Sequence, residues 1–444
     1  MKTCAFITLG CKVNQYETQA IRESLMAKGF VETVSEQAAD LYVINTCTVT
    51  SASDDKSRQH IKRVRRKNPN ATVVVTGCYA EADAEAVKKL EGVDFVITKA
   101  EEAQIAEIIC RDTVPRIPTS LSKRRERGGD ASITGLEKEA IYHLKISQFA
   151  GHTRAFLKIE DGCDQYCSYC IIPYVRGSIK SRRPQDILEE ARRLIGNGFK
   201  EIILTGIHLG AYGKDTRGSY RLLDIIQTLS NLSGLKRLRL SSIEANEITH
   251  DLIDLVLHSK KICPHFHIPL QSGDDSILKR MNRRYTSSQY LEILDDIRSK
   301  INVPSFTTDI IVGFPGEQDE HFENTVNLCK RAGFSRVHIF PFSVRESTPA
   351  AKMNNHCSPQ TINRRKTLLD ATAKTLAFSY KRQFLGAYAE VLVEKERDSK
   401  TNKLCGYSER YIKVLFEGPD TIKNSMVSVR IEDVAPSFAM GILQ

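Results

Sequence analysis

The sequence predicts an α/β protein with three folded parts: a doubly wound parallel sheet, a partial (β/α)6 barrel and a small antiparallel β-barrel. For the first two parts, short apolar runs alternate with helical segments, and several of the runs end in Gly, Ser or Cys. For the third part, short runs of alternating polarity follow one another near the C-terminus. We place these parts at residues 1–110, 146–377 and 378–444, and the stretch 111–145, which lacks apolar periodicity, is predicted to be a linker.

The bulk composition narrows the class of protein. The chain has 444 residues and a formal charge of +10, which suits a polyanionic partner. Its 12 cysteines are too sparse for a disulfide scaffold of this size. Neither a secretory signal nor an apolar run long enough to span a membrane is present in the sequence. We therefore expect a cytoplasmic protein, and a monomer, whose thiols serve metals or catalysis or are simply buried.

Cys163, Cys167 and Cys170 form the pattern C-x3-C-x2-C directly after a predicted strand at 155–159. Thiolates at this spacing can hold three corners of a cubane iron–sulfur cluster and leave its fourth iron open. A disulfide framework does not fit this loop, because its three cysteines are odd in number. A zinc site stays open as an alternative, although no fourth ligand follows Cys170 closely.

A second trio is predicted from chain order in the N-terminal part. Cys11, Cys47 and Cys78 each come just after an apolar run that predicts a strand. The carboxyl ends of strands in an open parallel sheet lie along one edge, where ligands bind. We expect the three thiols to converge there as a second three-cysteine site. The alternative is three unrelated buried cysteines.

Six apolar runs, including the one before the cysteine loop, predict the strands of the partial barrel. They lie at 155–159, 201–206, 237–242, 265–270, 306–313 and 337–340. In such barrels function lies on the loops at the carboxyl ends of the strands. Gly206, Ser242, Glu244 and Gly313 lie at those ends, as does the cysteine loop. Glycine there lets a ligand approach the backbone, although ordinary turn chemistry explains a single glycine equally well.

Two segments have the residue types of nucleic-acid contacts. Residues 56–67 hold seven Lys and Arg and no acid, and we single out Lys62, Arg63 and Arg66 for contact with RNA phosphates. The other set, in the C-terminal strands, comprises Tyr407, Arg410 and Lys413. Side chains of these types stack on and pair with single-stranded RNA. A solvated helix face and an ordinary sheet surface are the respective alternatives.

The motifs together resemble the radical S-adenosylmethionine (SAM) methylthiotransferase family over nearly the whole chain. The resemblance rests on Gly10–Asn14, Asn45–Cys47, Gly77–Cys78, Ile172–Gly177, His267–Gly273 and Gly313–Glu317, and on the two cysteine trios. It implies two [4Fe–4S] clusters: an auxiliary one on Cys11, Cys47 and Cys78, and a SAM-cleaving one on Cys163, Cys167 and Cys170. It also implies that residues 378–444 are the family's TRAM domain. The SAM contacts it suggests are Tyr169, Gly206, Ser242, Glu244 and Gly313.

Within that family, Gly10–Glu17 and Leu204–Gly213 resemble one branch most. That branch places a methylthio group on carbon 2 of N6-threonylcarbamoyladenosine, next to the tRNA anticodon. The resemblance thus implies a tRNA carrying this nucleoside as partner, and an electron donor such as flavodoxin or ferredoxin. Two departures, at Ser178–Ser181 and Ala245, concern the substrate rather than the reaction.

Three alternatives stay open at this stage. Related enzymes with the same chemistry act on N6-isopentenyladenosine in tRNA or on a ribosomal-protein aspartate. The third alternative is a non-catalytic RNA-binding protein with structural iron–sulfur clusters, although structural clusters usually have full cysteine ligation.

Overall fold

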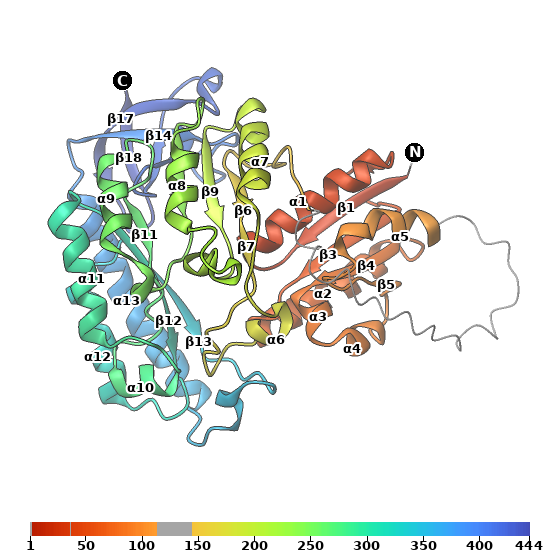
Figure 1. Ribbon diagram of the computed structural model, residues 1–444, viewed down its shortest axis with the longest axis horizontal. Coiled ribbons are helices and arrows are strands. Elements are labelled where there is room, and N and C mark those ends of the chain that lie inside the picture. Colours follow the sequence, from red (N-terminus) through yellow and green to blue (C-terminus); the bar gives the residue numbers. More distant parts are fainter. Residues whose placement is uncertain (1, 36, 113–143) are drawn as a thin grey trace, which may run out of the picture. The chain divides into compact units, whose positions relative to one another are not determined.

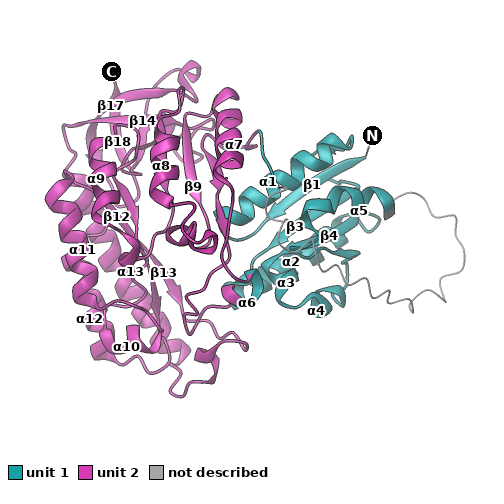
Figure 2. Cartoon of the chain, viewed as in Figure 1, with its two compact units in different colours: residues 1–147, 174–176 teal, residues 148–173, 177–444 magenta. Residues whose placement is uncertain are grey.

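The computed structural model describes residues 2–35, 37–112 and 144–444, so the predicted linker at 111–145 lies almost entirely outside the described residues. The chain divides into two compact units (Figure 2). Unit 1 comprises Met1–Ser147 and Tyr174–Arg176, and unit 2 comprises Gln148–Pro173 and Gly177–Gln444. The boundary proposed between residues 377 and 378 stays a prediction, because both segments belong to unit 2.

Unit 1 is built on a parallel sheet with the strand order β2-β1-β3-β4-β5 (Figure 1). The strands are β1 (Thr3–Thr8), β2 (Val31–Glu32), β3 (Leu41–Thr46), β4 (Thr72–Gly77) and β5 (Phe95–Val96). The helices are α1 (Lys12–Ala27), α2 (Ser51–Lys67), α3 (Cys78–Ala82), α4 (Ala84–Lys88) and α5 (Ile105–Asp112). From β1 the chain adds β2 on one side and then β3, β4 and β5 on the other, so the topological switch point lies between β1 and β3. Ligands bind at such a switch point in doubly wound sheets. The predicted fold of this part is confirmed.

The core of unit 1 lies on both faces of the sheet. Successive residues of a strand point to opposite faces, and β4 buries Val73 and Val75 in one apolar cluster but Val74 in the other. Helix α2 covers the first face with Ile61, and α1 covers the second with Ile21. Burial on both faces explains why these strands are continuous apolar runs rather than alternating ones.

Unit 2 contains the six predicted barrel strands, in two three-stranded parallel sheets. They are β6 (Ala155–Lys158), β9 (Glu201–Thr205), β10 (Arg237–Leu240), β11 (His265–His267), β12 (Ser305–Val312) and β13 (Arg336–Pro341). Parallel bridges Leu238↔Ile262 and Ser242↔His267 join the two sheets, so the strand order is 6-9-10-11-12-13. A partial parallel barrel was predicted and is confirmed.

Helices follow the barrel strands, as the βα alternation requires. They are α7 (Pro184–Gly196), α8 (Leu222–Ser230), α9 (His250–His258), α10 (Asp275–Arg280), α11 (Ser287–Lys300), α12 (Asp319–Ala332) and α13 (Pro359–Arg382). A short antiparallel pair, β7 (Glu160–Asp161) and β8 (Lys180–Ser181), brackets the cysteine loop and the short helix α6 (Ile172–Arg176).

The C-terminal segment forms a closed five-stranded barrel in the order β14-β15-β16-β18-β17. Its strands are β14 (Tyr388–Val393), β15 (Leu404–Ser408), β16 (Lys413–Phe416), β17 (Met426–Val434) and β18 (Ala439–Leu443). A small barrel was predicted correctly, but it is mixed rather than wholly antiparallel, because β16 and β18 run parallel. The loosely alternating run at 406–414 suggests one strand in the sequence, but the structure has two, β15 and β16, separated by a turn in which Tyr411 has φ +63°.

Buried ion pairs in unit 2 attach this small barrel to the start of β10. Arg239 Nε donates to Glu201 Oε1 at 2.8 Å, and its Nη2 donates to the Ser408 carbonyl at 3.1 Å. Arg237 Nη1 donates to the Tyr407 carbonyl at 2.9 Å. These contacts lie at the amino ends of the barrel strands, so they leave the opposite, carboxyl ends to the cysteine loop.

No helix within the described residues is long and apolar enough to cross a membrane.

Candidate metal centres

The first candidate centre lies at the carboxyl edge of the sheet in unit 1. Cys11 follows β1 and begins α1 as its N-cap, Cys47 follows β3, and Cys78 begins α3 after β4. These three strands are adjacent in the sheet. Cys11 and Cys47 therefore flank the topological switch point, and Cys78 comes from the next strand along the same edge.

Neighbouring residues fit closely around this trio. A Cβ on Gly10 would lie 3.1 Å from Cys47 Cβ, so the two cysteine segments are in close contact. Asn14 accepts from Cys11 Sγ through Oδ1 (3.3 Å) and donates through Nδ2 to the Thr46 carbonyl (2.9 Å). Gly77 has φ +92°, and a Cβ there would collide with the Asn45 side chain. A residue with a side chain could not occupy this turn without moving its neighbours.

Burial and nearby cations act in opposite directions on the pKa values of the thiols in this trio. Burial raises the pKa of the Cys78 thiol to about 11, while the cations Arg176 and Lys99 act in the opposite direction. Cys11 raises the pKa of both Cys47 and Cys78, as expected for thiols that lie near one another. Iron–sulfur clusters are held by thiolates. Three converging free thiols near a buried arginine and a partly buried lysine fit the auxiliary [4Fe–4S] cluster implied by the family resemblance.

The second candidate centre is the loop after β7. Gly162 has φ +87° and a Cβ there would collide with the Ser178 carbonyl, so only glycine fits between the strand and the loop. The Cys163 N–H donates to the Gly177 carbonyl (3.0 Å), and the Cys170 N–H donates to the Cys167 carbonyl (2.9 Å). These bonds fold the loop back so that its three thiols share one site.

Burial and mutual repulsion dominate the titration of these thiols. Burial, together with the nearby Cys167 thiol, raises the pKa of Cys163 and of Cys170 to about 12. Thiols that oppose one another's ionisation lose their protons readily only to a metal, because metal binding requires the thiolate. All 12 cysteines of the chain are free of disulfides. The donor set therefore fits a cluster held at three corners.

Arg283 is the cation beside this loop. Its Nη1 lies 3.4 Å from Cys167 Sγ and 3.2 Å from Glu244 Oε1, and its Nη2 donates to the other oxygen of Glu244. Tyr285 adds a hydroxyl that lies 2.9 Å from Arg283 Nη2. A fixed guanidinium next to a ligand sulfur stabilises negative charge on the thiolate. Arg283 was not singled out from the sequence, which gives it no motif position of its own.

Glu160 and His208 form a second missed feature of this loop. The His208 N–H donates to Glu160 Oε2 at 2.8 Å, and His208 Nδ1 lies 3.9 Å from Cys163 Sγ. Burial raises the pKa of Glu160 well above its ordinary value. His208 Nε2 also pairs with Glu247 Oε1 at 2.9 Å. His208 belongs to the segment Leu204–Gly213 that resembles the family, which was the available signal.

The five predicted SAM contacts are distributed around this loop. Tyr169 lies within it and packs against an apolar cluster that includes Phe314. Gly206 contacts Glu160 so closely that a Cβ would lie 2.6 Å from Oε2. Ser242 bridges to the barrel strand β11, and Glu244 is held by Arg283.

Gly313, the fifth, forms a tight turn: it has φ +78° and its N–H donates to Glu317 Oε2 at 2.5 Å. A binding role for all five stays a prediction.

The predicted RNA contacts fall into two groups. Lys62, Arg63 and Arg66 lie on α2 and are exposed, as expected of a phosphate-binding helix face.

Tyr407, Arg410 and Lys413 instead have contacts within unit 2. The Arg154 guanidinium lies 4.3 Å from the centre of the Tyr407 ring. Arg410 Nε donates to the Val303 carbonyl at 2.9 Å, and Lys413 Nζ lies 2.6 Å from Asp398 Oδ2. Whether these side chains also bind RNA stays a prediction.

Comparison with known proteins agrees with this geometry. The family models "Uncharacterized protein family UPF0004" and "Radical SAM superfamily" match residues 3–98 and 157–329. The radical SAM methyltransferase TsrM of Kitasatospora setae has a similar fold, with a TM-score of 0.54 and 14% identity over 79% of this chain and 75% of its own. The fold and the three-cysteine loop thus define a radical SAM protein.

Full-length relatives identify the family. The threonylcarbamoyladenosine tRNA methylthiotransferase MtaB of Bacillus subtilis is 39% identical over 97% of this chain and 94% of its own length. The protein of that name from Thermotoga maritima is 36% identical over 94% and 92%. The tRNA-2-methylthio-N(6)-dimethylallyladenosine synthase of Carboxydothermus hydrogenoformans is 32% identical over 100% and 99%. The chain belongs to the radical SAM methylthiotransferase family.

Proposed function

We propose that the protein is a tRNA-modifying enzyme that places a methylthio group on carbon 2 of N6-threonylcarbamoyladenosine, giving 2-methylthio-N6-threonylcarbamoyladenosine. The observation that carries the substrate is the full-length similarity to MtaB proteins of several organisms, at 36–39% identity. The observation that carries the chemistry is the pair of cysteine trios, each at the carboxyl ends of parallel strands.

We propose that Cys163, Cys167 and Cys170 hold the SAM-cleaving [4Fe–4S] cluster and that Cys11, Cys47 and Cys78 hold the auxiliary one. When bound, the clusters and SAM supply the radical, the sulfur and the methyl group, because no side chain can activate an aromatic C–H bond by acid–base chemistry. The chain's own contribution is to place thiolates and cations: Arg283 beside the first trio and Arg176 near the second.

The partners in this proposal are a tRNA, bound in part by the exposed cations of α2, and an electron donor such as flavodoxin or ferredoxin. A basic surface of this kind binds phosphate without reading sequence. The cytoplasm, where tRNA is modified, is the proposed compartment.

The dimethylallyladenosine synthases are the relatives that favour a second substrate. They match the whole chain, but at 32% identity, below the MtaB proteins. For that reason we keep N6-isopentenyladenosine as the competing nucleoside in the test.

The test is a reaction of cluster-loaded protein with SAM, reductant and one of two tRNAs, carrying either N6-threonylcarbamoyladenosine or N6-isopentenyladenosine. Nucleosides from each tRNA are then separated and weighed by mass spectrometry. We expect the methylthio product from the first tRNA only, and none from either tRNA with C47A. Methylthiolation of the second tRNA alone would overturn the proposed substrate but leave the reaction class intact.

A further inference from the structure

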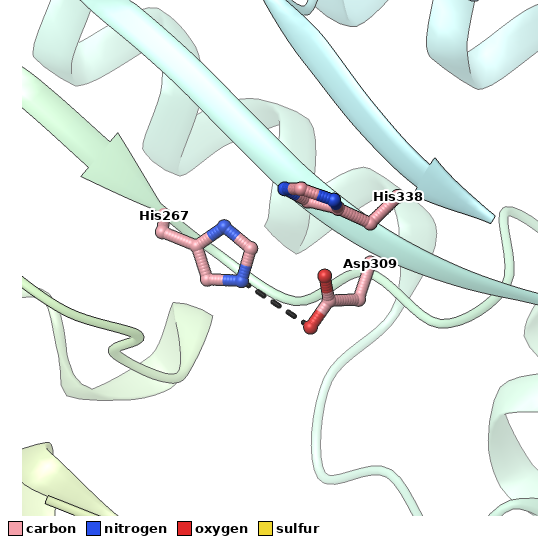
Figure 3. A group of neighbouring side chains, drawn as sticks. All are labelled: His267, Asp309 and His338. Carbon is pink, nitrogen blue, oxygen red and sulfur yellow. Dashed lines mark hydrogen bonds and ion pairs between the residues drawn. The ribbon is translucent and has the colours of Figure 1, made fainter. Parts of the chain in front are cut away.

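Three neighbouring barrel strands bring two imidazoles and a carboxylate together (Figure 3). His267 comes from β11, Asp309 from β12 and His338 from β13. Each offers one ligand atom, and all three atoms lie within 4.8 Å of one another. All three residues are partly exposed, so water or a ligand oxygen has room beside them.

Strand register explains why these side chains meet. Asp309 pairs directly with His338, and His267 pairs with Thr307, two residues before Asp309. Side chains two residues apart on a strand share a face, and direct partners on adjacent strands share it too. The group is therefore a product of the barrel's regular structure and not of a loop.

Hydrogen bonding orients the His267 ring. Its Nδ1 lies 2.9 Å from Thr307 Oγ1, and its Nε2 lies 3.2 Å from Asp309 Oδ2. Metal-binding histidines typically use one ring nitrogen for such an orienting bond and the other for the metal. Two atoms each about 2.1 Å from one ion, at an angle of about 100°, are about 3.2 Å apart. The 3.2 Å between Nε2 and Oδ2, the length of the hydrogen bond that joins them, is thus also compatible with a shared ion.

We propose that His267, Asp309 and His338 bind a divalent first-row transition-metal ion. Two imidazoles and one carboxylate with open positions are the donor set that such ions take in non-haem sites. Because nitrogen and oxygen donors make this site, it is chemically separate from the thiolate sites of the iron–sulfur clusters. The proposal does not depend on which nucleoside the enzyme modifies.

The probe is Mn²⁺, which prefers oxygen and nitrogen donors to thiolates. Full-length, cluster-loaded protein with oxidised, diamagnetic clusters is titrated with Mn²⁺, and the free ion is measured by electron paramagnetic resonance. We expect the wild type to bind about one Mn²⁺ per chain tightly. In D309N and in H338A we expect the Mn²⁺ affinity to fall by about tenfold or more. The matched control is H250A, which removes the exposed His250–Asp296 pair (2.9 Å) and should bind Mn²⁺ as the wild type does.

The proposal would be overturned if the wild type did not bind Mn²⁺ tightly. It would also be overturned if D309N and H338A bound Mn²⁺ with the same affinity as the wild type. The group would then be part of the barrel's hydrogen bonding and not a metal site. Asparagine keeps the size of Asp309 and one hydrogen-bonding oxygen, so D309N decides the question even if H338A fails to fold. Circular dichroism and iron content check that each variant retains its fold and its clusters.

Discussion

Arg176 and Glu17 form a buried two-point ion pair in unit 1. Arg176 Nη1 lies 3.0 Å from Glu17 Oε1, and Nη2 lies 3.3 Å from Oε2. Lys99 Nζ lies 2.6 Å from the same carboxylate. Arg176 also donates to Asn14 Oδ1 at 3.0 Å, the atom that accepts from Cys11 Sγ. One arginine thus links a buried carboxylate to the hydrogen bonding of the auxiliary cysteines.

We expect R176A to lower the stability of unit 1 and the iron content of its cluster site together. Removing Arg176 takes away two hydrogen bonds to the buried Glu17 carboxylate but leaves Lys99 beside it, so we expect a loss of about 1–3 kcal/mol, less than for a wholly unpaired buried charge. Lysine keeps the charge but loses the two-point geometry, so R176K should fall between R176A and the wild type. Iron analysis and thermal unfolding measure both effects.

The control for this change is R221A, which breaks the exposed Arg221–Asp224 pair (2.6 Å) and should leave stability and iron content nearly unchanged. If R176A keeps the iron content and unfolding temperature of the wild type, Arg176 has no part in the auxiliary site.

The pair Arg239–Glu201 should control the attachment of the C-terminal barrel. Burial raises the pKa of Glu201, but the Arg239 guanidinium, with Arg154 and Arg237, outweighs burial and holds the pKa below its ordinary value. A lowered carboxyl pKa gives stability that is present above the ordinary pKa and is lost as the pH falls through the folded-state pKa. The free energy of unfolding of the wild type, measured in urea, should therefore fall as the pH drops below about 4.

R239A should be less stable than the wild type by about 3–5 kcal/mol at pH 7, with a smaller further loss on acidification. Limited proteolysis provides a second readout, since a loosened barrel exposes the chain near Tyr388 to cleavage. Identical urea and proteolysis profiles for R239A and the wild type would contradict this role.

Lys381, in the last turn of α13, should make stability depend on alkaline pH. Burial lowers its pKa to about 8 from 10.5, and its Nζ donates to the Pro436 carbonyl at 2.8 Å. Between these two values the unfolded chain binds more protons than the folded one, so Lys381 adds stability as the pH rises through this window.

The comparison that isolates this effect is the wild type against K381M, because other groups also titrate in this range. Between pH 8 and pH 10.5 we expect the unfolding free energy of the wild type to rise by roughly 2 kcal/mol relative to that of K381M. A difference that stays constant with pH would show that Lys381 titrates normally.

The exposed cations of α2 should contribute to tRNA affinity without selecting a sequence. We expect the triple variant K62A/R63A/R66A to bind tRNA more weakly and to reduce the slope of log affinity against log salt by about 2–3, or about one per phosphate contact. Filter binding at several salt concentrations measures this slope. The control removes three exposed cations of α13, namely Lys366, Lys374 and Arg382. An equal loss in both triple variants would mean that only net charge matters.

The sequence was sufficient to predict the structural features that depend on local patterns of residues. Runs such as Val73–Val75 predicted strands buried on both faces, and the order of strand and cysteine predicted that Cys11, Cys47 and Cys78 share an edge. Strand β2 was missed because Val31–Glu32 is a two-residue, exposed edge strand with no pattern of its own. The strand break at Tyr411 was missed because a left-handed non-glycine residue has no reliable signature.

Features that depend on distant residues could not be predicted. Arg176 meets Glu17 across 159 positions, and neither residue type points to the other. Tyr407 and Arg410 have the chemistry of RNA contacts, but the same chemistry suits packing within unit 2, where Tyr407 lies under Arg154. Only the folded chain shows that such contacts are made.

The most direct measurement for the account compares two triple variants in one assay. Cluster-loaded wild type should hold about eight irons, and each variant, C11A/C47A/C78A or C163A/C167A/C170A, about four. With reductant, SAM and tRNA, the first variant should still release 5′-deoxyadenosine but form no methylthio nucleoside, and the second should do neither. A wild type with only four irons, or methylthio product from C11A/C47A/C78A, would contradict the account of two separate three-cysteine cluster sites.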